Sequence, residues 1–154
     1  GFEGVKRRFT HVGEIDGYRI IDDYAHHPVE IAATLSSARQ AVKDSGGRVI
    51  TIMQPHRYTR VESLFHDFCT CFNDADIVYV TPIFEAGEKP IEGISQESLV
   101  AGIRDAGHRN VMPIDAPEKL AVTIKNIAQK DDIVVCMGAG SISLWANALP
   151  EQLG

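Results

Sequence analysis

The fold is decided by residues 18 to 28, which read Tyr18-Arg19-Ile20-Ile21-Asp22-Asp23-Tyr24-Ala25-His26-His27-Pro28. The first four residues are typical of a short strand, and Pro28 stands where the first turn of a helix accepts proline. Two carboxylates, a phenol and two imidazoles lie between these two elements. Because open α/β sheets bind ligands where strands end and helices begin, this polar cluster predicts a binding site.

Short apolar strands alternate with helices along the rest of the chain. We expect further strands over residues 48–53, 77–81, 110–114 and 133–137, and helices over 28–43, 61–72, 95–107, from 117 and over 141–149. Asp16-Gly17 is a strong turn signal and predicts a hairpin between residues 9–15 and 18–21. The pattern predicts one α/β domain over 1–154, with a mostly parallel sheet flanked by helices. The N-terminal β-hairpin would contribute an antiparallel strand.

Composition excludes several classes of protein. A net charge of −6 argues against a nucleic-acid or membrane-surface partner, which prefers a basic face. No apolar run is long enough to span a bilayer, and no secretory signal is recognisable. Cys69, Cys71 and Cys136 make no disulfide framework, which favours reduced, buried thiols in a cytoplasmic protein. The chain does not begin with Met, so we expect a piece of a longer protein.

Right-handed crossovers place every strand-to-helix loop at the same edge of a parallel sheet. That edge should therefore gather five parts of the chain, namely residues 22–27, 54–60, 84–92, Asp115 and 138–141. The loop over residues 82–93 is longer than a routine connection, which favours a mobile functional loop.

The second motif is Gln54-Pro55-His56-Arg57-Tyr58-Thr59-Arg60. Arg57 and Arg60 stand three residues apart at a helix entrance, where both can turn toward one anion. Guanidinium forks bind carboxylate or phosphate in bidentate fashion, and the helix start adds free N–H groups. Anion binding is therefore favoured over a pair of surface salt bridges.

The first cluster allows several roles. Asp23 can accept from ribose hydroxyls or hold a metal-bound water, whereas Asp22 suits a helix cap or a strand-end bond. A zinc site is disfavoured because the ligand spacing does not fit. His26 is as well explained by a pocket as by a structural role, and His27 is better explained as structural. Tyr24 suits a pocket wall or the core.

Two further segments are ambiguous. Residues 138–141, Gly-Ala-Gly-Ser, could cradle an anion, but they make an incomplete dinucleotide fingerprint and equally suit a close-packed turn. Lys6-Arg7-Arg8 could be solvated or could reach a phosphate. The chain has neither a P-loop nor a nucleophile elbow, so it shows recognition of anions and hydroxyls without the groups for chemistry.

The motifs at residues 22–28, 54–60 and 138–142 resemble, in order and spacing, those of the C-terminal domain of the Mur ligases. The resemblance covers nearly the whole chain. It implies that residues 1–154 are the third, Rossmann-like domain, which closes over ATP. The N-terminal UDP-binding domain and the central ATPase domain would be absent, so the isolated domain should be inactive.

The resemblance also implies an ATP-dependent acid–amino-acid ligase of the bacterial cytoplasm. It would join L-alanine to UDP-N-acetylmuramate through an acyl phosphate, in peptidoglycan synthesis. Arg8 and Asp23 then match positions that contact ATP, and Tyr24 and His26 match the L-alanine pocket. Arg57 and Arg60 match catalytic positions that also face the alanine carboxylate. Mg2+ ligands are expected mainly in the absent central domain, and none are expected in this chain.

Two other functions are weighed against this one. A related ligase attaches a recycled murein tripeptide to the same sugar nucleotide, but it lacks the Pro-His-Arg-Tyr-Thr-Arg form of the second motif. Ala25 stands where the family often has Gly, a mild departure.

A non-enzymatic phosphoacceptor domain would use a pair such as Asp22-Asp23, but it needs an Asp and a Lys after later strands. Those strands end in Thr81-Pro82 and Gly138 instead.

Overall fold

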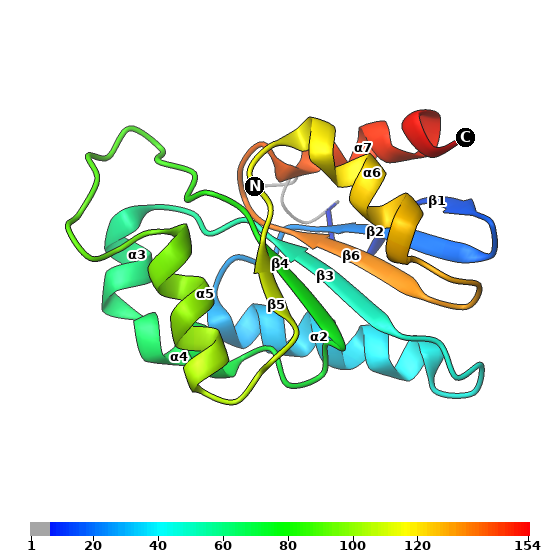
Figure 1. Ribbon diagram of the computed structural model, residues 1–154, viewed down its shortest axis with the longest axis horizontal. Coiled ribbons are helices and arrows are strands. Elements are labelled where there is room, and N and C mark those ends of the chain that lie inside the picture. The colour runs from blue at the N-terminus through cyan, green and yellow to red at the C-terminus, as the bar shows by residue number, and fades with distance from the viewer. Residues whose placement is uncertain (1–6) are drawn as a thin grey trace.

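One sheet of six strands forms the centre of the molecule, in the order β1-β2-β6-β3-β4-β5 (Figure 1). The computed structural model describes residues 7–154. The strands are β1 (Thr10–Ile15), β2 (Tyr18–Asp23), β3 (Val49–Met53), β4 (Ile77–Val80), β5 (Val111–Pro113) and β6 (Ile133–Met137). β1 is antiparallel to β2, and the other neighbouring strands are parallel. The predicted fold class is confirmed.

Helices cover both faces of this sheet (Figure 1). They are α2 (Pro28–Val42), α3 (Tyr58–Ser63), α4 (Phe65–Thr70), α5 (Gln96–Asp105), α6 (Pro117–Ile127) and α7 (Ile142–Leu153). The first four pack on one face and the last two on the other. The central strands β3 and β6 are buried along their whole length, as expected for a sheet covered on both sides.

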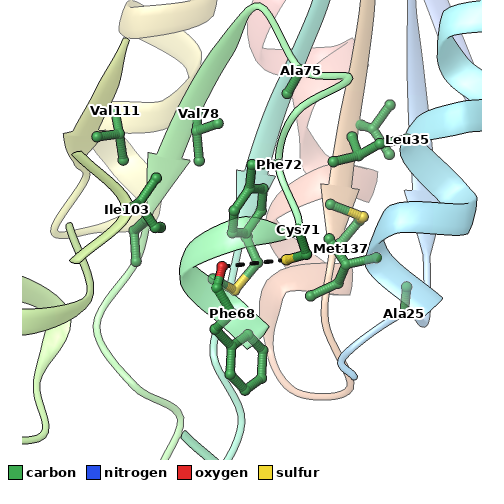
Figure 2. Packing of buried hydrophobic residues seen from close by; sticks show 14 of the residues in the cluster. Ala25, Leu35, Phe68, Cys71, Phe72, Ala75, Val78, Ile103, Val111 and Met137 are labelled. Carbon is green, nitrogen blue, oxygen red and sulfur yellow. Dashed lines mark hydrogen bonds between the residues drawn. The ribbon is translucent and has the colours of Figure 1, made fainter. Parts of the chain in front are cut away.

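The core has two layers because successive strand residues point to opposite faces. Val135 and Met137 of β6 pack with α2, while Val134 and Cys136 pack with α6 and α7. Figure 2 shows the first layer, where Phe68 and Phe72 lie among residues of α2, α5 and the strands. The described cysteines are free and buried, as predicted, and burial raises the pKa of Cys71 to about 12.

The predicted hairpin turn is confirmed at Asp16-Gly17. Both residues have positive φ angles, 50° and 84°, which is the requirement of a type I′ turn. A Cβ on Gly17 would lie 2.8 Å from Lys130 Cγ, so glycine also suits the packing here.

The helix expected over residues 61–72 is wrong in one respect: it is two short helices. It begins earlier, at Tyr58, and breaks at Leu64, whose φ and ψ are −117° and 23°. Val61 of α3 and Phe68 of α4 both reach the core despite the break. Their spacing also fits one straight helix, so the apolar pattern could not reveal the change of direction. The last helix, in turn, extends beyond 149 to Leu153.

The position of β6 creates the functional edge. This strand lies between β2 and β3, although it comes last in the chain. The connections after β2 and β3 run to helices on one face, whereas the connection after β6 runs to α7 on the other. A crevice opens at the carboxyl ends of strands where neighbouring connections diverge in this way. Residues 24–27, 54–60 and 138–141 all follow these three strands.

Candidate functional site

Backbone hydrogen bonds hold the three loops together just beyond the strands. Gly138 N donates to Asp23 O at 3.2 Å, and Gln54 N donates to Met137 O at 2.9 Å. The three chains therefore leave the sheet side by side, and the predicted gathering of these segments is confirmed.

Asp22 and Asp23 point to opposite faces of the sheet and have different hydrogen-bond partners. Asp22 is buried on the α7 side, where its carboxylate accepts from Arg7 Nη2 at 3.1 Å and Nε at 3.3 Å. It also accepts from Ser143 Oγ at 2.7 Å and Asn147 Nδ2 at 3.2 Å. Asp22 thus ties the start of the described chain to α7, which is a structural role.

Asp23 is buried on the α2 side. Its Oδ2 accepts from Phe9 N at 2.7 Å, and its Oδ1 accepts from Ala25 N at 2.8 Å and from Thr34 Oγ1 at 3.3 Å. A carboxylate offers about four acceptor directions, and donors from residues 7–154 occupy three of them, so within this part of the chain one direction of Oδ2 is left. Asp23 orders the loop around it and keeps a single capacity for a ligand hydroxyl.

Four rings from three loops form a row beyond the carboxyl ends of the strands. Tyr24 and His26 meet edge to face with ring centroids 5.0 Å apart, and His26 lies 6.0 Å from His56. His56 in turn stacks on Phe84 at 5.4 Å. His26 Nδ1 donates to Tyr24 O at 2.9 Å, which fixes its ring. Tyr24 and His26 therefore line one continuous wall with residues of the second motif.

His56 belongs to the second motif, but the sequence analysis assigned no role to it. Arg60 Nη1 lies 3.2 Å from both His56 Nδ1 and His56 O. A guanidinium can only donate, so Nδ1 accepts and the ring proton is on Nε2. Burial, with the charges of Arg60, His26 and Arg57, lowers the pKa of His56. The ring is thus neutral near pH 7 and presents an N–H donor.

Arg57 occupies a strained position at the start of α3. Its φ and ψ of 73° and 132° lie where non-glycine residues are rare. Its N–H donates to Phe84 O at 2.8 Å, and its side chain is exposed. Together with Thr59 and Arg60 it lines an open hollow of about 550 Å3. Strain of this kind costs about 1–3 kcal/mol and clusters at functional sites.

The glycine turn after β6 is a close-packed turn. A Cβ on Gly140 would lie 2.7 Å from Phe84 Cγ. Gln54 holds the turn from the other side, because its Oε1 accepts from Ile142 N at 3.0 Å and its Nε2 donates to Ser141 Oγ at 2.9 Å. The backbone N–H of Ile142 is therefore already bonded within the protein, which favours a close-packed turn over an anion-binding turn.

Three other residues that the sequence analysis singled out, Arg8, Asp115 and His27, lie outside the row of rings. Arg8 is exposed, between Arg7 and Phe9, which are bonded to the two aspartates. Lys6 of the same basic stretch lies outside the described residues. Asp115 does not join the row of rings, since it lines a different hollow with Gln96 and Arg104. His27 is structural, as expected, because its Nδ1 caps α2 by accepting from Val29 N.

Comparison with known families gives this geometry a context. The family described as Mur ligase, glutamate ligase domain, matches residues 7–140. The chain belongs to the Mur ligase family.

Curated relatives agree with that assignment. A UDP-N-acetylmuramate–L-alanine ligase from Parvibaculum lavamentivorans is 61% identical over 153 residues, which is 99% of this chain and 30% of the relative. The chain thus spans about a third of the length of the curated relatives it matches.

Solved Mur ligase structures share the fold. A UDP-N-acetylmuramate–alanine ligase from Thermotoga maritima aligns with a TM-score of 0.73 at 22% identity, over 95% of this chain and 29% of that one. A murein peptide ligase from Psychrobacter arcticus aligns with 0.75 at 22%, over 97% and 30%. At this identity the likeness establishes the fold alone.

Two features of this Mur ligase domain concern ligands and membranes. Within residues 7–154 no three His, Cys, Asp or Glu side chains are arranged to hold a metal ion. In the same part of the chain, no helix combines the length and apolar character that a membrane crossing demands.

Proposed function

We propose that this Mur ligase domain is the C-terminal part of an ATP-dependent ligase that joins L-alanine to UDP-N-acetylmuramate in the bacterial cytoplasm. The N-terminal UDP-binding domain and the central ATPase domain would belong to the same enzyme. The observation that carries the proposal is the position of Arg60. Its guanidinium donates to His56, whose ring lies 6.0 Å from that of His26, and Arg60 lines the same hollow as Arg57. The names of relatives at 57–61% identity support it.

The arginines suit a small amino acid with a free carboxylate. Arg57 is exposed, whereas Arg60 is half-buried and its guanidinium donates to His56. Planar forks of this kind bind a carboxylate with two parallel hydrogen bonds. Arg57 and Arg60 would hold the alanine carboxylate and stabilise charge on the reacting groups, while Tyr24 and His26 would wall the pocket.

ATP would supply the phosphoryl group that activates the muramate carboxylate as an acyl phosphate. Arg8 is solvent-exposed at the edge of the crevice, where its charge can reach a phosphate. Asp23 has one acceptor direction left, which suits a ribose hydroxyl. Mg2+ ligands would lie mainly in the central domain.

The recycling ligase for murein tripeptide is the second candidate. The Psychrobacter arcticus structure shares the fold at 22% identity, which carries no information on substrate. Giving the intact enzyme alanine or tripeptide as acceptor separates the two, and use of the tripeptide alone would exclude the first. The phosphoacceptor hypothesis loses its basis, since both aspartates are engaged in structural bonds and the family is that of a ligase.

The deciding experiment measures phosphate release by the intact enzyme from ATP and UDP-N-acetylmuramate, with and without L-alanine. We expect alanine-dependent release that falls by about 100-fold or more in Arg60→Ala, since removing one charge-stabilising donor has this effect. Arg109→Ala is the matched control, because Arg109 is exposed near the amino ends of the strands. Release that ignores alanine, or equal rates in the Arg60 and Arg109 variants, would overturn the proposal.

A further inference from the structure

The loop over residues 82–93 is fastened to the start of α3 by Glu88. One oxygen of Glu88 accepts from Thr59 N at 3.1 Å, and the other accepts from Thr59 Oγ1 at 2.6 Å. Arg57, at the N-cap of α3, makes no side-chain cap bond of its own. Glu88 therefore supplies, from a distant part of the chain, an acceptor that the first turn of the helix lacks.

A tight turn delivers this carboxylate. Glu88 N donates to Glu85 O at 3.1 Å, and the two residues between them, Ala86 and Gly87, have φ angles of 53° and 84°. Alanine in the left-handed region costs about 1–2 kcal/mol, so the turn is kept against a local preference. Strained positions thus stand on both sides of the contact, at Ala86 and at Arg57.

The same loop holds Arg57 from its other side. Phe84 O accepts from Arg57 N at 2.8 Å, and Phe84 N donates to Pro55 O at 2.8 Å. The backbone of Arg57 is therefore bracketed, with Phe84 before it and Glu88 after it. A strained conformation persists only where its surroundings over-determine it, and these two contacts do so here.

The position of Arg60 depends on the same contacts of Phe84 and Glu88. Its guanidinium donates to His56 O and His56 Nδ1, and His56 pairs with Phe84 in an isolated bridge. If the first turn of α3 relaxed, both guanidinium groups would shift relative to the row of rings.

Glu88 is charged but forms no ion pair with Arg57. Hydrogen bonds from the Thr59 side chain and backbone, and the charge of Arg57, hold its pKa below the ordinary value. In the described part of the chain, the ion pairs within 4.0 Å do not include one between Glu88 and Arg57. The guanidinium of Arg57 thus stays available to an external carboxylate.

We propose that Glu88 is a positioning residue: through Thr59 it sets the turn that aims Arg57 and Arg60 at the carboxylate of the incoming amino acid. This inference rests on the proposed function. Glu88 itself need not touch substrate, and its removal should weaken amino-acid binding before it affects the handling of ATP.

The test compares the steady-state kinetics of the intact ligase with those of Glu88→Ala. We expect the KM for L-alanine to rise about tenfold or more, as small misplacement of binding groups has effects of this size. The KM for ATP should be unchanged, and kcat should change less than the KM for alanine. Glu92→Ala is the matched control, an exposed carboxylate of the same loop.

Two variants of Thr59 keep the test sharp if Glu88→Ala should fold poorly. Thr59→Val removes the hydroxyl and should raise the KM for alanine, whereas Thr59→Ser keeps it and should behave as wild type. Combining Thr59→Val with Glu88→Ala should add little to Glu88→Ala alone, because both changes break one contact. Melting temperatures report separately on folding.

Each result is decisive. An unchanged KM for alanine in Glu88→Ala and Thr59→Val would overturn the positioning role alone. A lowered KM would also overturn it, since Glu88 would then compete with the substrate carboxylate. Wild-type phosphate release that does not depend on alanine would overturn the proposed function together with this inference.

Discussion

At the scale of single residues, the site depends on where a guanidinium is held and how it is shaped. Arg57 combines an exposed head group with a left-handed backbone. Arginine and lysine carry the same charge, but only arginine offers a planar fork to a carboxylate. The contribution of shape can therefore be separated from that of charge and that of backbone strain.

We expect Arg57→Lys to raise the KM for L-alanine by about tenfold or more in the intact ligase, because a point charge cannot replace a bidentate fork. Lysine and arginine suffer the same strain at this φ, so the melting temperature should stay constant. Arg57→Gly is the companion variant. It should also lose affinity, yet gain about 1 kcal/mol of stability by relieving the strain. Near-normal kinetics in Arg57→Lys would show that the planar fork is not required, and near-normal kinetics in Arg57→Gly would show that the side chain is not required.

Some of this residue-level detail could be predicted from the sequence, and some could not. The two-residue period of a strand already implies that Asp22 and Asp23 face opposite sides. The motif brought Arg57 and Arg60 to the site, but the role of His56 needed the geometry of its ring nitrogen. The contact of Glu88 with Thr59 joins residues 29 positions apart, across a loop whose turn no local pattern announced.

At the scale of elements, the opposite edge of the sheet is held by a charged contact. Asp132, at the start of β6, accepts from the side chain and backbone N–H of Arg48, at the start of β3, and from Gln129 N. Arg48 Nη2 also donates to Ile127 O at 2.6 Å. One carboxylate thus joins the amino ends of the two central strands to the end of α6.

This contact predicts a loss of stability in acid. Burial alone would raise the pKa of Asp132, but the hydrogen bonds from Arg48 and Gln129 outweigh it, and the pKa lies below its ordinary value. A lowered folded-state pKa gives stability that is present above the unfolded-state pKa and is lost as pH falls through the folded one. Urea unfolding of the domain should therefore show Asp132→Asn to be less stable than wild type at pH 7. The difference should shrink below about pH 3.8, the ordinary value. A difference that does not vary with pH would contradict this.

Helix boundaries show the same division between local and distant causes. The start of α2 follows from Pro28 and from the capping of His27 and Glu30, all local in sequence. The break at Leu64 does not, because an unbroken helix satisfies the same apolar spacing.

At the scale of the whole molecule, the proposed site would be only partly enclosed by this domain. The hollow beside Arg57 and Arg60 is open, and small ligands gain affinity by being surrounded. We expect the isolated domain to bind ATP and L-alanine no more tightly than about millimolar and to make no product. Calorimetric titration of each ligand checks this. Micromolar binding would mean that the site is already complete without its other domains.

The late position of β6 also governs how the domain comes to be folded. Ile133 pairs with both Arg19 and Val49, so β6 is synthesised after the two strands between which it lies. Until the ribosome has released that segment, β2 and β3 have a missing neighbour between them and expose apolar, unpaired edges. Long-range pairing of this kind folds slowly and leaves nascent chains prone to aggregate. The strand order that opens the crevice on either side of β6 therefore also leaves β2 and β3 without a neighbour until β6 is made.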